Sequence, residues 1–193
     1  MAKLKLGVLG SGKGSNYRAI QEAIDAGTID AEVVLVISDV ESAGILELAR
    51  RRGVPARFIA PGRFRTKLEP EIETVYLREL QKAGVELLIL AGFMRMLKKP
   101  MLEAFSNRII NIHPSLLPAF PGIESWKQAL EAGVHTTGCT VHYVDEGMDT
   151  GPIIAQSEVP VLPDDTPQTL HARIQLAERA LYPAVLRDLT EGK

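Results

Sequence analysis

The sequence predicts an α/β protein built on an open, mainly parallel, twisted sheet with an antiparallel addition. Three observations support this fold class. Apolar runs rich in Val, Ile and Leu alternate with longer amphipathic segments, which is the order of strands and helices in βαβ units. A glycine-rich turn follows the first run, where open α/β sheets bind anions. After residue 113 two strand-like runs follow one another, which predicts an antiparallel edge.

Five strands are expected first, because each run is almost continuously apolar, as in strands buried on both faces. They cover residues 4–10, 32–38, 56–59, 85–92 and 108–113. Helices are expected between them, and several end in glycine or follow a strand turn; they cover 15–27, 43–53, 69–84 and 99–105. Beyond a proline-rich loop we expect a helix at 124–133, strands at 136–144 and 151–161, and a final helix at 167–192.

Length and composition indicate one ordinary globular domain spanning residues 1–193. The net charge of −2 gives no overall basic field, so we expect no nucleic-acid partner. The one cysteine, Cys139, excludes an internal disulfide and suits a reducing compartment. The N-terminus does not resemble a signal peptide, and no apolar run is long enough to span a bilayer. We therefore expect a cytoplasmic protein without a membrane partner.

The glycine-rich turn GVLGSGKGSN, residues 7–16, nearly matches two nucleotide-binding motifs. An ATP-binding loop needs a hydroxyl residue after Lys13, where Gly14 stands. A dinucleotide site needs a later third glycine, although Asp39 near the end of the second strand suits its ribose contact. A small phosphate monoester fits better, because backbone N–H groups and a helix N-terminus attract anions. The alternative is a tight turn with Ser15 as helix cap.

The segment RIINIHPSLLPAFPG, residues 108–122, places Asn111 and His113 on one face at the end of a central strand. An amide beside an imidazole can stabilise an oxyanion and transfer a proton. Alternatively, both side chains bond only the local loop backbone. Downstream, Asp149 could hold the imidazole and favour its protonated form, whereas Asp145 and Glu146 are typical of a solvated acidic hairpin.

No metal site is expected from the sequence. Cys139 and His142 have the spacing of a ligand pair, but two ligands without partners make a poor zinc site.

Four motifs together are similar to those of the phosphoribosylglycinamide formyltransferases, folate-dependent enzymes of purine synthesis. They are GSGKGSN (10–16), AGFMRML (91–97), NIHPSLLPAFPG (111–122) and HYVDEGMDTGPII (142–154). The resemblance extends from Lys5 to about Leu186. It implies a formyltransferase-type fold with a Rossmann-like N-terminal half: a phosphate-binding half at about 1–105 and a catalytic and folate-binding half at about 106–193.

The resemblance also implies the chemistry, which is formyl transfer from 10-formyltetrahydrofolate to the amine of glycinamide ribonucleotide without a metal. The implied catalytic residues are Asn111, His113 and Asp149. The implied phosphate site is Gly12, Lys13, Gly14, Ser15 and Asn16, and the implied ribose site is Glu178 with Gln175. The implied folate site comprises Arg65, Met94, Arg95, Met96, Leu97, Asn111, Val144, Glu146, Gly147 and Asp149. The segment PGRFRTKLEPE departs from the Ser-Arg-Glu form of the family, and Arg65 is placed there by position alone.

Three alternatives remain open at this point. Methionyl-tRNA formyltransferase shares the Asn, His and Asp pattern, but its loop usually reads S-L-L-P-x-x-R-G and a tRNA-binding domain follows, which we do not expect in a chain that stops at Lys193. Formyltetrahydrofolate hydrolase normally has an extra N-terminal regulatory domain. A non-catalytic nucleotide-binding module would need only the glycine loop. We expect small-molecule partners and a monomer or homodimer.

Overall fold

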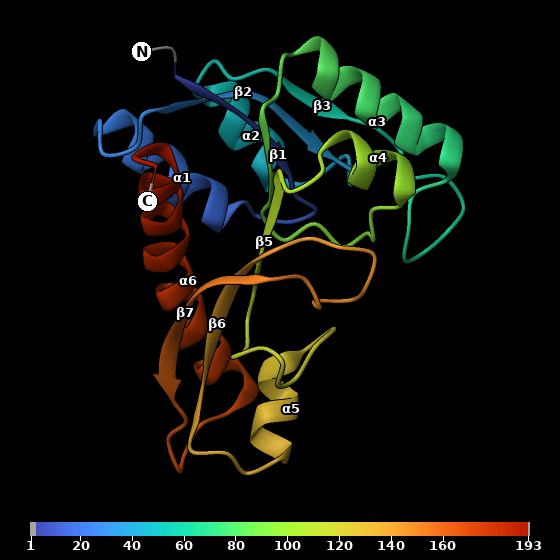
Figure 1. Cartoon of the computed structure of the whole chain (residues 1–193). Coiled ribbons are helices and arrows are strands. Elements are labelled where there is room, and N and C mark those ends of the chain that lie inside the picture. Colours follow the sequence, from blue (N-terminus) through green and yellow to red (C-terminus); the bar gives the residue numbers. More distant parts are fainter. Residues whose placement is uncertain (1–2, 193) are drawn as a thin grey trace.

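The computed structural model describes residues 3–192 (Figure 1). Met1, Ala2 and Lys193 of the expected 1–193 domain lie outside the described residues. Within the described chain there is one seven-stranded sheet in the order β3-β2-β1-β4-β5-β6-β7. The strands are β1 (Leu4–Leu9), β2 (Ala31–Ser38), β3 (Ala56–Phe58), β4 (Leu87–Leu90), β5 (Ile109–His113), β6 (Thr136–Tyr143) and β7 (Ile153–Pro160).

The pairing confirms the predicted sheet. Strands β1 to β5 pair in parallel, whereas β6 pairs antiparallel with β5 and with β7. Strand β5 is therefore an interior strand at the junction of the two parts. The helices of the described chain are α1 (Ser15–Asp25), α2 (Gly44–Arg51), α3 (Pro70–Lys82), α4 (Lys99–Ala104), α5 (Ser125–Glu131) and α6 (Pro167–Thr190).

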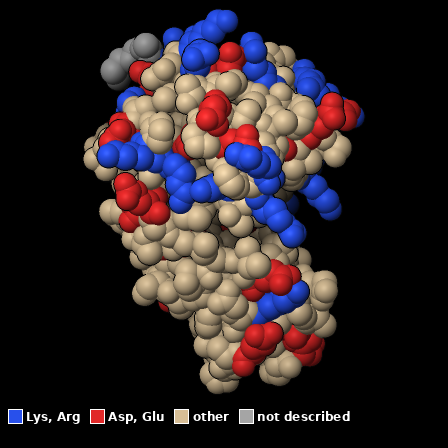
Figure 2. Space-filling view, turned by 90° about the vertical axis from the view of Figure 1, so that its right-hand side faces the viewer, with Lys and Arg blue, Asp and Glu red and all other residues tan. Residues whose placement is uncertain are grey.

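Helices cover both faces of the sheet, as buried parallel strands require. One apolar cluster joins the sheet to α1, α2 and α6 through residues such as Tyr17, Ile45 and Ile174. A second cluster joins the opposite face to α3 and α4 through Tyr76 and Met101. Helix α1 lies beside α6, which brings early and late parts of the chain together (Figure 1). On the face seen in Figure 2, charges of both signs are interspersed, in keeping with the small net charge.

The glycine-rich turn connects β1 to α1 and gives the helix an unusual start. Gly14 is the N-cap, in a left-handed conformation with φ of 80°. A Cβ at this position would lie 2.9 Å from the Cα of Ile45, so both the conformation and the space require glycine. Helix α1 begins at Ser15, and no side chain caps it. The alternative that Ser15 caps the helix is therefore wrong, because the left-handed residue before it occupies the cap position.

Tyr182 attaches α6 to the sheet at strands β4 and β5. Its side chain is fully buried, and its hydroxyl lies 3.0 Å from the carbonyl oxygens of both Leu90 and Ile110. One hydroxyl hydrogen is thus shared between β4 and β5. This contact places α6 next to the point where β5 continues to Asn111.

Candidate active site

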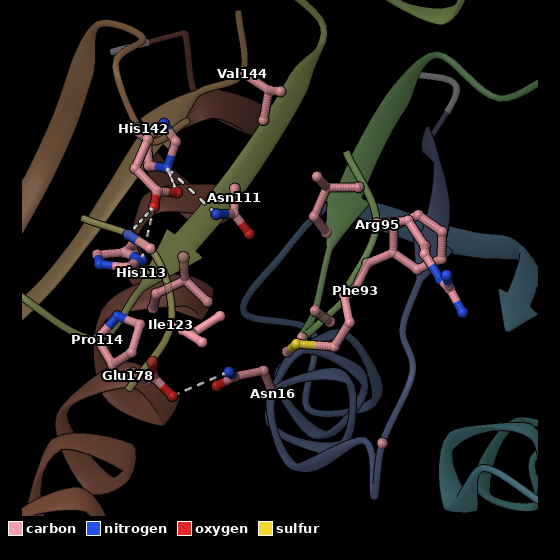
Figure 3. Close-up of a pocket in the computed structure, with 18 of the residues that line it drawn as sticks. Asn16, Phe93, Arg95, Asn111, His113, Pro114, Ile123, His142, Val144 and Glu178 are labelled. Atoms are coloured by element: carbon pink, nitrogen blue, oxygen red, sulfur yellow. Dashed lines mark hydrogen bonds and ion pairs between the residues drawn. The ribbon is translucent and has the colours of Figure 1, made fainter. Parts of the chain in front are cut away.

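A cavity of about 620 Å³ opens at the C-terminal ends of β1, β4 and β5. This is the edge where open α/β sheets bind ligands, and the volume suits a small organic molecule. The glycine loop and residues 90–97 form part of the wall, and residues 111–114 together with most of 142–149 form another part (Figure 3). Helix α6 contributes His171, Gln175 and Glu178. Segments from both halves of the chain therefore contribute to a single cavity.

His113 has oxygen acceptors at both ring nitrogens. It is the last residue of β5 and its side chain is almost completely buried. Its Nε2 lies 2.9 Å from the carbonyl oxygen of Phe120, which can only accept, so Nε2 carries a hydrogen. Its Nδ1 lies 3.4 Å from Oδ2 of Asp149. Each ring nitrogen of His113 therefore faces an oxygen that can accept a hydrogen bond.

Asp149 connects two loops at the mouth of the cavity. Its Oδ2 accepts a hydrogen bond of 2.9 Å from the backbone N–H of Gly122 and also faces His113. Its Oδ1 lies 3.7 Å from Nε2 of His142. Asp149 itself has a positive φ of 56°. The carboxylate therefore lies between two imidazole rings and holds the loop after β5 against the loop after β6.

His142 is a site residue that the sequence analysis considered only as a metal ligand. It stands opposite Asn111 in the antiparallel register of β5 and β6. Its Nδ1 donates to the carbonyl oxygen of Tyr143 at 2.8 Å, so Nε2 is the acceptor for the Asn111 amide Nδ2 at 3.3 Å. Burial lowers the pKa of His142 below its ordinary value, which favours the neutral ring that this arrangement requires. Neutral His142 thus orients the amide of Asn111.

Another part of the cavity wall, on α6, carries a buried carboxylate. Glu178 on α6 is 7% exposed, and Asn16 Nδ2 donates a hydrogen bond of 3.2 Å to its Oε2 (Figure 3). Burial raises the pKa of Glu178 to about 7. Asn16 Oδ1 is buried and has no hydrogen-bond partner within the described residues. This wall can therefore accept hydrogen bonds from ligand hydroxyl or amine groups.

These features combine an anion-binding turn with an amide, an imidazole and a carboxylate at one cavity, and comparison with known proteins agrees with that combination. Residues 4–186 match the formyl transferase family. The chain belongs to the formyl transferase family.

The formyl transferase is similar to proteins of purine synthesis. It is 43% identical over 185 residues to the phosphoribosylglycinamide formyltransferase of Bacillus subtilis (strain 168), covering 96% of this chain and 94% of that protein. It is 48% identical to the trifunctional purine biosynthetic protein adenosine-3 of Drosophila pseudoobscura pseudoobscura, of which the chain spans 14%. The crystal structure of glycinamide ribonucleotide transformylase 1 from Symbiobacterium toebii has a TM-score of 0.94 and 48% identity, covering 99% of this chain and 89% of that chain. The resemblance indicated by the sequence motifs is confirmed.

The structure of this formyl transferase brings most predicted site residues to the cavity. Those that line it are Gly12, Lys13, Gly14, Ser15, Asn16, Met94, Arg95, Met96, Leu97, Asn111, His113, Val144, Gly147, Asp149, Gln175 and Glu178. Arg65 and Glu146 are exposed and stand outside the lining residues of the described cavity. Asp145, expected only as a solvated residue, lines the cavity and holds its turn by accepting from Gly147 N–H and the Thr150 hydroxyl.

Several lining residues were missed because nothing in their sequence pattern indicates a ligand. Trp126 on α5 stacks on His171 of α6, with ring centroids 3.6 Å apart and planes within 6°. Ile123 and Met148, both largely exposed, stand at the cavity mouth. A search of residues 3–192 finds no group of three or more potential ligands placed to hold a metal ion. In the same part of the chain, none of the helices combines the length and apolar character needed to cross a membrane.

Proposed function

We propose that this chain transfers the formyl group of 10-formyltetrahydrofolate to the amine of glycinamide ribonucleotide, a step of purine synthesis. The observation that carries the proposal is the convergence of Asn111, His113 and Asp149 on one cavity whose other wall is the glycine loop. An acceptor with a phosphate at one end and an amine at the other spans these two groups. Two similar proteins are named phosphoribosylglycinamide formyltransferase and glycinamide ribonucleotide transformylase, which is the same reaction class.

In the proposed mechanism the neutral amine of the acceptor attacks the formyl carbon and an oxyanion develops on the formyl oxygen. Asn111 donates a hydrogen bond to that oxygen with the N–H that His142 does not use, a contact that strengthens as charge develops. Imidazolium His113 stabilises the same charge. To reach the oxyanion through Nε2, His113 exchanges the Phe120 carbonyl for it.

Asp149 balances the charge of His113 and relays the proton in this proposal. The attacking amine loses a proton as the C–N bond to the acceptor forms. The folate nitrogen gains a proton as its bond to the formyl carbon breaks. A carboxylate beside His113, acting through a water molecule, can accept the first proton and supply the second, so no net proton is released. The scheme needs no metal ion.

The two substrates occupy opposite ends of the cavity. The acceptor phosphate binds the backbone N–H groups of the glycine loop, Gly12 to Asn16, at the N-terminus of α1. Its ribose hydroxyls donate to Glu178 beside Gln175. The pteridine ring packs against the segment 94–97 and against Val144, Gly147 and Asp149. Arg65 and Glu146 remain candidates only for the exposed end of the folate.

The test offers the purified protein 10-formyltetrahydrofolate with three acceptors: glycinamide ribonucleotide, methionyl-tRNA and water. We expect the ribonucleotide to be formylated at least tenfold faster than either of the other two acceptors. Preferred formylation of tRNA, or release of formate alone, would replace the proposal with one of the related reactions. Binding of nucleotides without formyl transfer would identify a non-catalytic module. We also propose a cytoplasmic monomer or homodimer without a nucleic-acid partner.

A further inference from the structure

The side chain of Ser11 joins the two segments to which we assign the two substrates. Its backbone N–H donates to the carbonyl of Gly92 at 3.0 Å. Its hydroxyl accepts from the backbone N–H of Met94 at 3.0 Å and donates to Oδ1 of Asp39 at 2.5 Å. Ser11 thus bonds the glycine loop to the segment 91–97 at two points, one through its backbone and one through its side chain. A displacement of either segment is transmitted to the other.

A buried ion pair holds Ser11 in this position. Asp39 follows β2 and is 5% exposed. Its second oxygen, Oδ2, accepts from Arg95 Nε at 2.7 Å, and Arg95 Nη1 donates to the carbonyl of Phe64 at 2.5 Å. In Figure 3 the Arg95 side chain points away from the space between the two walls. A buried carboxylate with both oxygens engaged is costly to disturb, because loss of one partner leaves a buried charge unpaired.

This network also explains the residue that favoured a dinucleotide site. Asp39 stands where such a site would contact a ribose, but both of its oxygens are engaged by Ser11 and Arg95. Ser11 and Asp39 are absent from the residues that line the described cavity. Their role is therefore one of holding other groups in place.

We propose that Ser11, held by the Asp39–Arg95 pair, is a positioning residue that couples the two substrate sites. The inference rests on the proposed function, since that function assigns the ribonucleotide to the glycine loop and the folate to the segment 94–97. A ligand at either site fixes the shared network, and the second ligand then meets a segment already in place. By linkage each substrate tightens the binding of the other by the same factor.

Calorimetry with two ligands that cannot react provides the test. The dissociation constant of tetrahydrofolate, which has no formyl group, is measured with and without saturating glycinamide ribonucleotide. In the wild-type protein the ribonucleotide should tighten tetrahydrofolate binding about fivefold or more, the lower end of ordinary coupling. In Ser11→Ala, and in the nearly isosteric Asp39→Asn, the ratio should fall below about twofold, and each ligand should still bind alone.

The matched control is Glu79→Gln, which also converts a carboxylate to an amide. Glu79 pairs with Arg57 at 2.9 Å, away from the residues that line the cavity. This variant should keep the wild-type ratio even if its melting temperature falls. A ratio lost equally in Glu79→Gln, or kept in Ser11→Ala and Asp39→Asn, would overturn the coupling. A wild-type ratio near one, with both ligands bound, would overturn the inference alone. Failure to bind either ligand would overturn the proposed function and this inference together.

Discussion

Asn16 and Glu178 are 162 positions apart in the sequence, and their side chains share a hydrogen bond of 3.2 Å on the wall of the cavity. The contact joins the first turn of α1 to the middle of α6. It also places a carboxylate with a pKa of about 7 at the proposed ribose position. The protonation of Glu178 therefore changes within the range of ordinary assay conditions.

Ribonucleotide affinity should depend on the ionisation of Glu178. Ionised Glu178 can accept hydrogen bonds from two hydroxyls. Protonated Glu178 carries an O–H donor on one oxygen, so it has less capacity to accept from them. Binding to the wild-type protein should tighten as the pH rises from 6 to 8. In Glu178→Gln this part of the pH dependence should vanish, and affinity at pH 8 should fall about tenfold. Calorimetry on both proteins over this range cancels the titration of the substrate itself. Parallel pH profiles would contradict the assignment.

Glu178→Gln should also change the pH dependence of stability. The pKa of Glu178 is raised from 4.5 to about 7 on folding, so between these pH values the unfolded chain releases a proton that the folded chain keeps. The contribution of Glu178 to stability therefore falls as the pH rises through this window, by at most roughly 3 kcal/mol. Denaturant titrations at pH 5 and pH 8 should show a smaller difference in Glu178→Gln. An equal difference in both proteins would show that Glu178 is not the group that titrates in this window.

The glycine loop should bind the phosphate of the ribonucleotide. Ser15→Glu introduces a negative charge at the first residue of α1 and should weaken the ribonucleotide at least tenfold, since a charge-assisted phosphate contact contributes about 1.5–3 kcal/mol. Folate affinity should hardly change. Gly14→Val should also weaken the ribonucleotide, but its Cβ would meet Ile45 at 2.9 Å and disturb the loop itself.

Gly12→Ala is the sharper companion of Ser15→Glu. A Cβ at Gly12 would have no heavy atom of the described structure within 4 Å, so the fold should be retained. Loss of ribonucleotide binding in this variant would then report the approach of the ligand to the backbone. Variants of the loop that lose folate and keep the ribonucleotide would show that the two sites are assigned the wrong way round.

Asp149→Asn should lower turnover by roughly 10²-fold or more, the usual scale of a positioned acid–base group, with both ligand affinities nearly unchanged. The amide oxygen can still accept from Gly122 N–H, so the loops should keep their places. The carboxylate beside His113 is removed, so the proton relay of the proposed mechanism should be interrupted. Glu158→Gln is the control, because Glu158 is an exposed carboxylate on β7 and is absent from the residues that line the described cavity. Equal losses in both variants would remove Asp149 from the chemistry.

His142→Phe should reduce turnover about tenfold, less than the roughly 10²-fold or more that follows deletion of an oxyanion donor, because the Asn111 amide is misplaced and not removed. The phenyl ring keeps the shape but leaves the Asn111 amide without its acceptor at 3.3 Å. The pKa of His142 is lowered from 6.5 by burial, so its NMR titration should have a midpoint below that value. The contribution of His142 to stability should fall as the pH drops below 6.5, because the unfolded chain binds the proton first; this contribution opposes that of Glu178 in the same range. A midpoint above 6.5 would contradict the neutral ring.

Asp165→Asn should destabilise the start of α6. The carboxylate accepts from Arg173 and from the Thr169 hydroxyl, and Oδ2 also accepts from Leu162 N–H. These bonds, those from Arg173 first, hold the pKa of Asp165 below its usual range. Its stabilisation is therefore present at neutral pH and lost only in strong acid. Thermal melts at pH 7 should shift down by a few degrees. An unchanged melting temperature would show that the pair contributes nothing.

Most of the fold could be predicted because apolar periodicity fixes the order of elements. The runs at 32–38 and 85–92 became β2 and β4, and the two consecutive runs after residue 113 became the antiparallel edge of β6 and β7. The exact ends of the helices could not be predicted in the same way, since capping depends on backbone geometry. Gly14 rather than Ser15 caps α1, because only the three-dimensional approach of Ile45 requires the left-handed glycine.

The candidate site was predictable where residues share a strand or a motif. Asn111 and His113 follow from alternation along β5. The contact of His142 with Asn111 depends on the register of β5 against β6, which the connection between them sets and no sequence pattern reveals. Arg65 lies on an exposed loop without periodicity, so no sequence pattern indicates the direction of its side chain. Asp39 looked free for a ligand because its partner Arg95 is 56 positions away.

The neighbouring positions of α1 and α6 have a consequence for how the molecule is made. The proposed acceptor site takes its phosphate contacts from the first helix and its ribose contacts from the last. A fragment of the chain that lacks either helix therefore does not contain the whole site. During synthesis the sheet of β1, β2 and β4 can form long before α6 leaves the ribosome, yet such a partial protein would have only one wall of the site. Ligand bound across both helices would then fasten the last helix to the first, and would make unfolding from the C-terminal side harder by a free energy that rises with the logarithm of substrate concentration.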